Sequence, residues 1–207
     1  MAGHIAESDS VEWCTPQWII DGVKEAFGGV IDLDPCSNSS SIVGALNSYS
    51  LPNKNGLAEP WNGNNVFVNP PFGIVYNKVE YLGLTEYEIT CITRKQYKLL
   101  EEEAQLDYIK SSISDWIKKC IDTSWGSPNR SLVALIPAHV DTKIWQQYIF
   151  KTHTKVCFLK GRVNYLRTDG KTGPAPMACA LVLWTGNPDV KERFNEAFES
   201  RGYIIGE

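Results

Sequence analysis

The sequence predicts an α/β protein in which a mostly parallel sheet carries helices on both faces and includes an antiparallel strand near the C-terminus. Short apolar runs typical of buried strands recur along the chain, at 30–33, 66–68, 132–136, 156–159 and 178–184. Stretches with helical periodicity lie between several of these runs, and such alternation indicates a parallel sheet covered on both sides. With 207 residues the chain can form one sizeable core, so we expect a flexible N-terminus over 1–10 and a single domain over 11–207.

The first predicted helix runs from Pro16 to about Phe27. Thr15 is a candidate N-cap, and Pro16 suits the first helical turn because its missing N–H would have no partner there. Gly28-Gly29 then ends the helix, because glycine readily adopts the conformations that close a helix.

Two short strands and an irregular stretch follow this helix. The run 30–33 is predicted as a buried strand that ends at Asp34-Pro35, and 66–68 is predicted as a second. Between them, the Ser-, Asn-, Gly- and Pro-rich stretch 36–63 predicts loops with at most short elements. The second strand leads directly into Asn69-Pro70-Pro71-Phe72, where two prolines end the strand and fix a loop.

The second half of the chain continues the alternation. Residues 85–106 predict helical structure, because 98–104 is rich in good helix formers. A helical stripe of Ile113, Trp116, Ile117, Cys120 and Ile121 predicts a helix over 111–124. After the strand 132–136, we expect a helix at 145–150, strands at 156–159, 162–166 and 178–184, and a turn at 168–173.

The charge distribution is more informative than the total charge. A formal net charge of −4 does not indicate a nucleic-acid-binding protein. One stretch is nevertheless basic and opposed only by Asp169, so it could follow phosphates or could be a solvated surface. Its basic residues are Lys143, Lys151, Lys155, Lys160, Arg162, Arg167 and Lys171.

Composition argues against a metal site and a membrane span. The six cysteines are dispersed and there are three histidines, so clustered zinc ligands are not expected and the thiols should be reduced and mostly buried. No apolar stretch is long enough to cross a bilayer, and the N-terminus lacks the pattern of an export signal. We therefore expect no metal, no membrane contact and a cytoplasmic location.

The loop Asn69-Pro70-Pro71-Phe72 lies at a strand end, where α/β enzymes place their chemistry. Asn69 offers an amide carbonyl, and Pro70 offers a backbone carbonyl without an N–H, so two acceptors can point at one amino group. Phe72 offers a face on which a planar base can stack. Two acceptors beside an aromatic face suit a conjugated amine, whose lone pair they would draw out of the ring plane toward an electrophilic methyl group.

These residues resemble a known family. Asn-Pro-Pro-aromatic resembles the catalytic motif of amino-methyltransferases that use S-adenosylmethionine, and its surroundings resemble the phage-type DNA adenine-N6 methyltransferases (Dam-like). The resemblance covers roughly 11–75 and 111–185. Its matching pieces, in order, are Trp13-Cys14-Thr15-Pro16, Phe27-Gly28, Leu33-Asp34-Pro35-Cys36-Ser37, Asn55-Gly56-Leu57 with Trp61, Val66 to Gly73, Ile136-Pro137-Ala138, Leu159-Lys160-Gly161-Arg162 and the late strand.

The resemblance implies a Rossmann-like fold and S-adenosylmethionine as cofactor. Asp34-Pro35-Cys36 resembles an acidic-Pro form of the first cofactor motif, although no Gly-x-Gly follows. Thr15-Pro16 resembles the segment that covers the methionine end of the cofactor, and Asn55 with Leu57 would lie near its adenine. Asp32 competes with Asp34 as the acid that contacts the ribose or the amino group, and Asp34 is favoured.

The resemblance also implies a DNA substrate, phage or prophage origin and a host-cytoplasmic location. The role of the methylation stays open between restriction-modification, as protection of a viral genome, and regulation. Adenine would be flipped into the pocket, with Asn69, Pro70, Pro71 and Phe72 as the catalytic loop. Phe72, Lys160 and Arg162 would contact the substrate, although Arg162 could equally be a surface residue paired with an acid. Residues 74–110 form an insertion relative to the family and a candidate for target recognition. A monomer or weak dimer is expected.

Several alternatives stay open at this point. The loop would equally suit cytosine N4 in DNA, adenine N6 in RNA or a protein glutamine. A non-catalytic nucleic-acid-binding protein of the same fold is a further alternative, although that role would not need the acceptor pair at Asn69 and Pro70. A nicotinamide-dependent oxidoreductase is disfavoured because the glycine-rich fingerprint is missing. His139 and Asp141 lack a nucleophile motif and are interpreted as structural.

Overall fold

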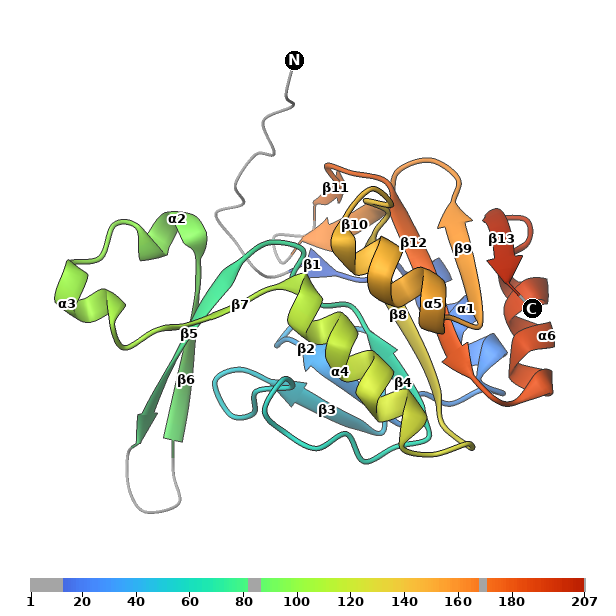
Figure 1. Ribbon diagram of the computed structural model, residues 1–207, viewed down its shortest axis with the longest axis horizontal. Helices are drawn as coiled ribbons and strands as arrows, with labels where there is room; N and C mark the ends of the chain where they lie inside the picture. Colours follow the sequence, from blue (N-terminus) through green and yellow to red (C-terminus); the bar gives the residue numbers. More distant parts are fainter. Residues whose placement is uncertain (1–12, 82–86, 168–170, 207) are drawn as a thin grey trace.

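The computed structural model describes residues 13–81, 87–167 and 171–206, and its body is built on a seven-stranded sheet (Figure 1). Helices separate some of its strands along the chain, although no helix lies between residues 33 and 68. Across the sheet the strands follow the order β13 (Gly202–Gly206), β9 (Lys155–Leu159), β12 (Cys179–Thr185), β8 (Ser131–Pro137), β4 (Asn65–Val68), β2 (Leu33–Ser37) and β3 (Asn47–Ser50).

The sheet is mixed. Strands β3, β2, β4 and β8 pair in parallel, whereas β12 runs antiparallel to both of its neighbours, β8 and β9. This confirms the expected antiparallel strand near the C-terminus. The edge strand β13 is a second antiparallel strand that the sequence analysis missed, as it missed α6 (Pro188–Phe198).

Helices cover both faces of the sheet. On one face, α1 (Gln17–Ala26) and α6 pack together on a core cluster, and Gly22 lets the ring of Phe198 approach the α1 backbone. On the other face lie α4 (Ile113–Trp125), η1 (Trp145–Ile149) and α5 (Phe150–Thr152), with a second cluster beneath α4 and η1. The result is an α/β arrangement of three layers (Figure 1).

Two helix starts show how local sequence fixes these boundaries. Helix α4 begins with a capping box, in which Ser112 and Asp115 satisfy each other's backbone N–H groups. Helix α1 has Pro16 as its N-cap without a side-chain cap bond. The prediction that Thr15 caps α1 is therefore wrong, because its hydroxyl is engaged elsewhere.

Strand β2 begins three residues later than predicted. Gly28 and Gly29 both have positive φ, and the turn they form leaves Val30 43% exposed instead of in the sheet. The strand then continues past Asp34, with its pairing to β3 interrupted between Asp34 and Ser37. Pro35, which has no N–H to donate, lies in this irregular part, where a sheet tolerates proline.

A separate three-stranded sheet lies beside the carboxyl ends of the main strands. It has the order β1 (Trp13–Cys14), β10 (Asn164–Arg167) and β11 (Thr172–Pro174), all antiparallel. We call it the small sheet. The strand expected at 162–166 is β10, and part of the turn expected at 168–173 lies outside the described residues.

Residues 75–81 and 87–111 project from the body in Figure 1, and we call them the arm. The arm contains an antiparallel sheet in the order β6 (Tyr87–Thr93), β5 (Val75–Tyr81) and β7 (Ile109–Ser111). It also contains two single-turn helices, α2 (Arg94–Tyr97) and α3 (Glu102–Gln105). In the described part of 85–106, the predicted helical structure is confined to these two short helices, because the β-branched residues of β6 favour a strand and pair with β5.

Two compositional expectations can be compared with the fold. All six cysteines lie within the described residues, none forms a disulfide, and four are buried. Across the described part of the chain, helices that could span a bilayer are absent.

Candidate active site

Strands β2 and β4 are neighbours that end at the same edge of the sheet. From β2 the chain continues to β3 on one side, and β4 is flanked by β8 on the other, so the strand order reverses between them. Crevices at such reversals are where α/β sheets bind ligands. A cleft of about 1410 Å³ opens here, lined by residues that follow both strands.

Two chain segments form the floor of this cleft. We call them the β2 segment (residues 34–41) and the β4 loop (residues 69–73). All four residues of the predicted catalytic motif, Asn69, Pro70, Pro71 and Phe72, line the cleft. Their convergence follows from the parallel pairing of β2 with β4, which aligns the carboxyl ends of the two strands.

The Asn69 side chain is held by a hydrogen bond to Thr15. Its side-chain Nδ2 donates a hydrogen bond of 2.9 Å to Oγ1 of Thr15, which is only 3% exposed. Thr15 and Pro16 do not line the cleft. The structure therefore places Thr15 next to the predicted catalytic residue, although the sequence analysis expected it at the cofactor.

Phe72 is half-buried and contacts the small sheet. The ring of Tyr165 on β10 meets it edge to face, with ring centroids 5.8 Å apart. Both rings line the cleft, and Tyr165 is itself buried. Burial raises the pKa of Tyr165 well above its ordinary value, so its phenol stays neutral.

Asp34 is buried within the β2 segment, and it does not line the cleft. Its carboxylate accepts hydrogen bonds from the Cys36 backbone N–H (3.0 Å) and the Ser41 hydroxyl (3.4 Å). Burial raises the pKa of Asp34 to about 6 despite these donors. Asp32 accepts from the backbone N–H groups of Asn64 and Asn65 at the other end of β4, so it holds the start of that strand.

Pro35 and Cys36 line the cleft directly. Burial, reinforced by Asp34, raises the pKa of the Cys36 thiol well above its ordinary value, so this thiol is neutral and a poor nucleophile. The Asn69 backbone acts on the same thiol and partly opposes this rise in its pKa, so the β2 segment and the β4 loop meet at this sulfur.

Residues 55–57 form a third part of the lining. The Asn55 side chain accepts from the Leu57 N–H at 2.9 Å, and a Cβ at Gly56 would collide with the carbonyl of Pro35. Lys119 of α4 donates to the carbonyls of Leu57 and Glu59, at 2.6 Å each. The predicted residues Asn55 and Leu57 therefore lie next to Pro35, held by contacts from α4.

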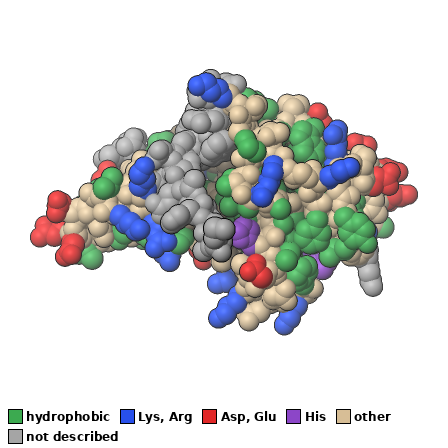
Figure 2. All heavy atoms as spheres, turned by 90° about the horizontal axis from the view of Figure 1, so that it is seen from above, with side chains coloured by type: hydrophobic (Ala, Val, Ile, Leu, Met, Phe, Trp, Pro, Cys, Tyr) green, Lys and Arg blue, Asp and Glu red, His purple; other side chains and the backbone are tan. Residues whose placement is uncertain are grey.

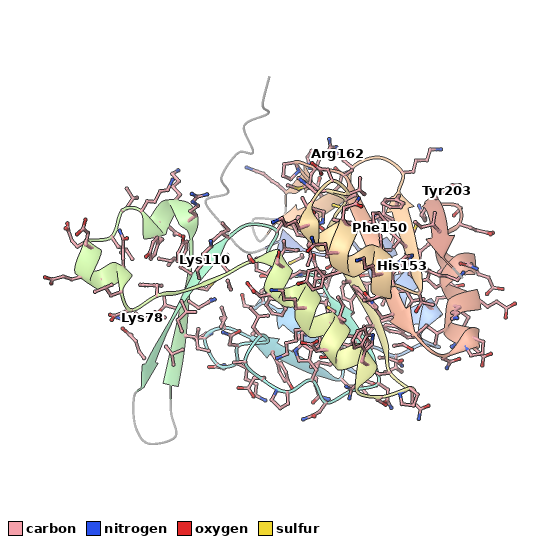
Figure 3. All side chains as sticks on the ribbon, in the orientation of Figure 1. Lys78, Lys110, Phe150, His153, Arg162 and Tyr203 are labelled. Carbon is pink, nitrogen blue, oxygen red and sulfur yellow. The ribbon has the colours of Figure 1, made fainter. Side chains whose placement is uncertain are left out.

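The cleft is cationic although the chain is acidic. Of the described residues that line it, none is acidic, whereas four are basic: Lys54, Arg94, Lys95 and Lys143. Of the basic stretch identified in the sequence, Lys143 alone lines the cleft, and the predicted substrate contacts Lys160 and Arg162 are exposed outside it. Figure 3 shows Arg162 on the body beside β10, away from the arm.

Sequence reasoning missed three of these cations. Arg94 and Lys95 come from α2 of the arm, and Lys54 comes from the turn after β3. The available signal was the Arg94-Lys95 pair inside the segment suspected of target recognition.

His139 also lines the cleft, with its carbonyl accepting from the Thr142 hydroxyl at 2.7 Å. In the described ranges, groups of three or more His, Cys, Asp or Glu that could hold a metal are absent.

Comparisons with known proteins identify the family of this chain. The sequence model of a family described as DNA N-6-adenine-methyltransferase (Dam) matches residues 3–188. A DNA N-6-adenine-methyltransferase of Haemophilus phage HP1 (strain HP1c1) is 29% identical over 66 residues, which are 32% of this chain and 37% of that relative. The aligned part thus spans little more than a third of the relative. Because the family match extends over most of the sequence, the chain belongs to the DNA N-6-adenine-methyltransferase (Dam) family.

Proposed function

We propose that this protein transfers a methyl group from S-adenosylmethionine to the N6 amine of adenine in DNA. The observation that carries the proposal is the setting of Asn69. Its amide nitrogen donates to Thr15, so its carbonyl oxygen is the group left to accept a hydrogen bond from a ligand in the cleft it lines. Pro70 adds a carbonyl and no N–H, and the amino group of adenine can donate to both acceptors.

The sheet supports a Rossmann-like methyltransferase fold. The resemblance implies a mostly parallel sheet with a late antiparallel strand, and β12 is such a strand, inserted between β8 and β9. The cleft lies where the strand order reverses, and the catalytic loop follows β4 directly. Both are the positions that this fold reserves for its ligands.

The lining from Pro35 to Asn38 and from Asn55 to Leu57 fits the nucleoside part of S-adenosylmethionine. The Gly56 backbone lies so close to the Pro35 carbonyl that a side chain at position 56 would not fit. This part of the cleft lining therefore consists of backbone and small side chains. The cofactor supplies an electrophilic methyl group on a sulfonium. The residues that would hold it are Pro35, Cys36, Asn55 and Leu57. Asp34 would contribute indirectly, because its carboxylate accepts a hydrogen bond from the Cys36 backbone N–H and fixes that backbone.

The size and charge of the cleft favour a nucleic-acid substrate. Its volume of about 1410 Å³ exceeds the range of roughly 300–1,000 Å³ for small-molecule sites and leaves room for a base beside the cofactor. Its four basic and no acidic side chains, among the residues described, would attract phosphates. Flipping would bring the adenine amine, otherwise held in a base pair, to Asn69 and the face of Phe72.

In the reaction, the N6 nitrogen forms a bond to the methyl carbon while the carbon–sulfur bond breaks, and the nitrogen then releases one proton to water. Asn69 and the Pro70 carbonyl would hold the amine in line and stabilise the positive charge that develops on nitrogen. Positioning and preorganised acceptors of this kind contribute most of the rate gain in such transfers.

The test is methyl transfer to unmethylated duplex DNA with tritiated S-adenosylmethionine, followed by nucleoside analysis. We expect label in N6-methyladenine, and a loss of at least about 100-fold in Asn69→Ala, the scale for removing one preorganised group. Asn62→Ala, an exposed amide on the approach to β4, is the matched control and should keep full activity. Label in N4-methylcytosine would reassign the base, and label only in RNA or protein glutamine would reassign the substrate.

A further inference from the structure

We propose that the arm holds the phosphate backbone of duplex DNA through Arg94 and Lys95 of α2, beside the base being methylated. This inference rests on the proposed function for its substrate. It concerns a surface outside the catalytic loop.

Two hydrogen bonds hold the root of the arm, one within the arm and one to the body. Strand β5 begins two residues after Gly73, and the buried Asn77 side chain donates to Ser111 at the end of β7 over 2.9 Å. The Ile89 backbone N–H of β6 donates to the carbonyl of Pro52, in the turn that follows β3. The arm therefore has a fixed position relative to the β4 loop.

Charge is separated along the arm. Arg94 and Lys95 line the cleft, whereas the acidic run Glu101, Glu102 and Glu103 is fully solvent-facing around α3. Figure 2 shows this separation, with acidic side chains gathered at the far end of the arm and basic ones between that end and the body. A polyanion would therefore bind near the root of the arm and be repelled from its tip.

The two cations lie on a supported element. Tyr97 of α2 stacks on Tyr76 of β5, with ring centroids 3.7 Å apart and planes within 6°. Tyr108 packs edge to face on Tyr97 at 6.2 Å. These three rings fix α2 against the sheet, so Arg94 and Lys95 project from a fixed backbone.

Other segments of the lining supply further cations. Lys143 follows β8 and Lys54 follows β3, and both line the same cleft as Arg94 and Lys95. Cations from several segments around the β4 loop suit a strand whose phosphates pass on either side of one extruded base. Duplex DNA is therefore the ligand that this lining suits best.

Binding and methylation are measured separately in the test. Anisotropy of a fluorescent 20-base-pair duplex at several salt concentrations should give a Kd about 10-fold higher or more for Arg94→Gln/Lys95→Gln. The salt slope should fall by nearly two, since each phosphate contact contributes about 0.9. The control Lys24→Gln/Lys191→Gln removes the same charge from α1 and α6, outside the cleft, and should bind like wild type.

Wild-type affinity and salt slope in the arm variant would overturn the proposal, and so would tighter binding of wild type to duplex RNA than to duplex DNA. Failure of the proposed function looks different. In that case wild type binds the DNA duplex with the expected salt slope but transfers no methyl group.

Independently, we infer that Thr15 is a positioning residue for the catalytic loop and that the small sheet is its scaffold. Cys14 pairs with Leu166 across β1 and β10, so Thr15 directly follows a strand of that sheet. Tyr165, the neighbour of Leu166, contacts Phe72. One scaffold thus contacts the first and the last residue of the Asn-Pro-Pro-Phe motif.

The chemistry of the β4 loop explains why it needs such support. Pro70 and Pro71 have no N–H with which to form a turn bond, and a free Asn69 amide could present either its oxygen or its nitrogen to the cleft. In the structure the Asn69 nitrogen donates to the buried Thr15 hydroxyl, and this bond holds the amide with its nitrogen facing inward. Thr15 would touch neither the amine nor the methyl group, so its effect passes through Asn69.

The test compares Thr15→Val, which keeps the shape and removes the acceptor, with Thr15→Ser, which restores a hydroxyl. Val should lower kcat about 10- to 100-fold, the scale of a small misplacement of a reacting group. KM for DNA and for cofactor should change little, and Ser should recover most of kcat. Equal kcat in Val and wild type, or equal losses in Val and Ser, would overturn the inference.

A second readout does not depend on activity. Hydrogen exchange of the Asn69 side-chain amide, followed by ¹⁵N NMR in the free protein, should be faster in Thr15→Val than in wild type or Thr15→Ser. Unchanged exchange in Val would contradict the hydrogen bond itself, whether or not the protein methylates adenine.

Discussion

The β2 segment and the β4 loop both follow strands of one sheet and meet at one cleft, but they are held in different ways. Within the β2 segment, Asp34 accepts from Cys36 and Ser41, and the Asn38 side chain accepts from the Ser40 N–H. The β4 loop is held by Thr15, 54 positions earlier in the chain, and by Tyr165 of the small sheet.

Proline content explains this difference. The β2 segment has one proline and several short polar side chains, which readily bond to nearby backbone N–H groups. The β4 loop has consecutive prolines at 70 and 71 and must take its support from distant residues. The β2 segment should therefore respond mainly to substitutions that disturb its local hydrogen bonds and packing. The β4 loop should respond mainly to substitutions of the distant residues that contact it.

The largest effect should come from the packing around the β2 segment. Gly56→Ala would place a Cβ against the Pro35 carbonyl and the Trp116 ring, and we expect a loss of about 3 kcal/mol in the free energy of unfolding, with weaker cofactor binding. Gly73→Ala in the β4 loop is the matched control, because a Cβ there meets nothing within 4 Å. Urea unfolding measures the loss of stability, and calorimetric cofactor titration measures the weaker binding. Equal effects of Gly56→Ala and Gly73→Ala would refute the expected difference between the two positions.

The next effect depends on pH. Because burial raises the pKa of Asp34 from 3.8 to about 6, the folded state binds its proton more tightly than the unfolded state. Its contribution to stability is complete below pH 3.8 and is lost as the pH rises through about 6. Asp34→Asn removes this dependence, so the variant should exceed wild type by roughly 2 kcal/mol at pH 8 and lose its advantage near pH 4.

Thermal unfolding of wild type and Asp34→Asn from pH 4 to pH 8 measures this difference. Parallel pH profiles of the two proteins would mean that the Asp34 carboxyl titrates normally. The buried Asp34 carboxylate would then not be the group that sets the stability of the β2 segment.

The smallest effect should come from the contact between the two segments. Cys36→Ala removes the sulfur at which they meet, and we expect about 1 kcal/mol lower stability with a modest fall in kcat. Cys36→Ser keeps an acceptor and should lie between Ala and wild type. If Ala and Ser unfold at the same urea concentration as wild type, this contact does not couple the segments.

The sequence predicted the parts of the structure that depend on local pattern. The strand before Asn69, the helix with the apolar stripe from Ile113 to Ile121 and the late antiparallel strand were all predicted, because periodicity is a local signal. The motif Asn69-Pro70-Pro71-Phe72 was also placed at a strand end by its own prolines.

The missing parts depend on contacts between distant residues. No local signal links Thr15 to Asn69, so Thr15 was assigned first to a helix cap and to the cofactor. Arg94 and Lys95 reach the cleft only because β5 and β6 turn the arm toward it. The strand pattern of β6 was available, but helix propensity in the following stretch outweighed it in the prediction.

The arm leaves and re-enters the body at one point. Val75 and Ser111 are partners across β5 and β7, and each is joined directly to the body, one to the β4 loop and the other to the start of α4. The described residues between this pair contribute no strand to the seven-stranded sheet, so its strand order does not depend on them. Under the proposed function, an exchange of the arm at Val75 and Ser111 that keeps the backbone contact of Ile89 with Pro52 would test whether the arm sets DNA preference.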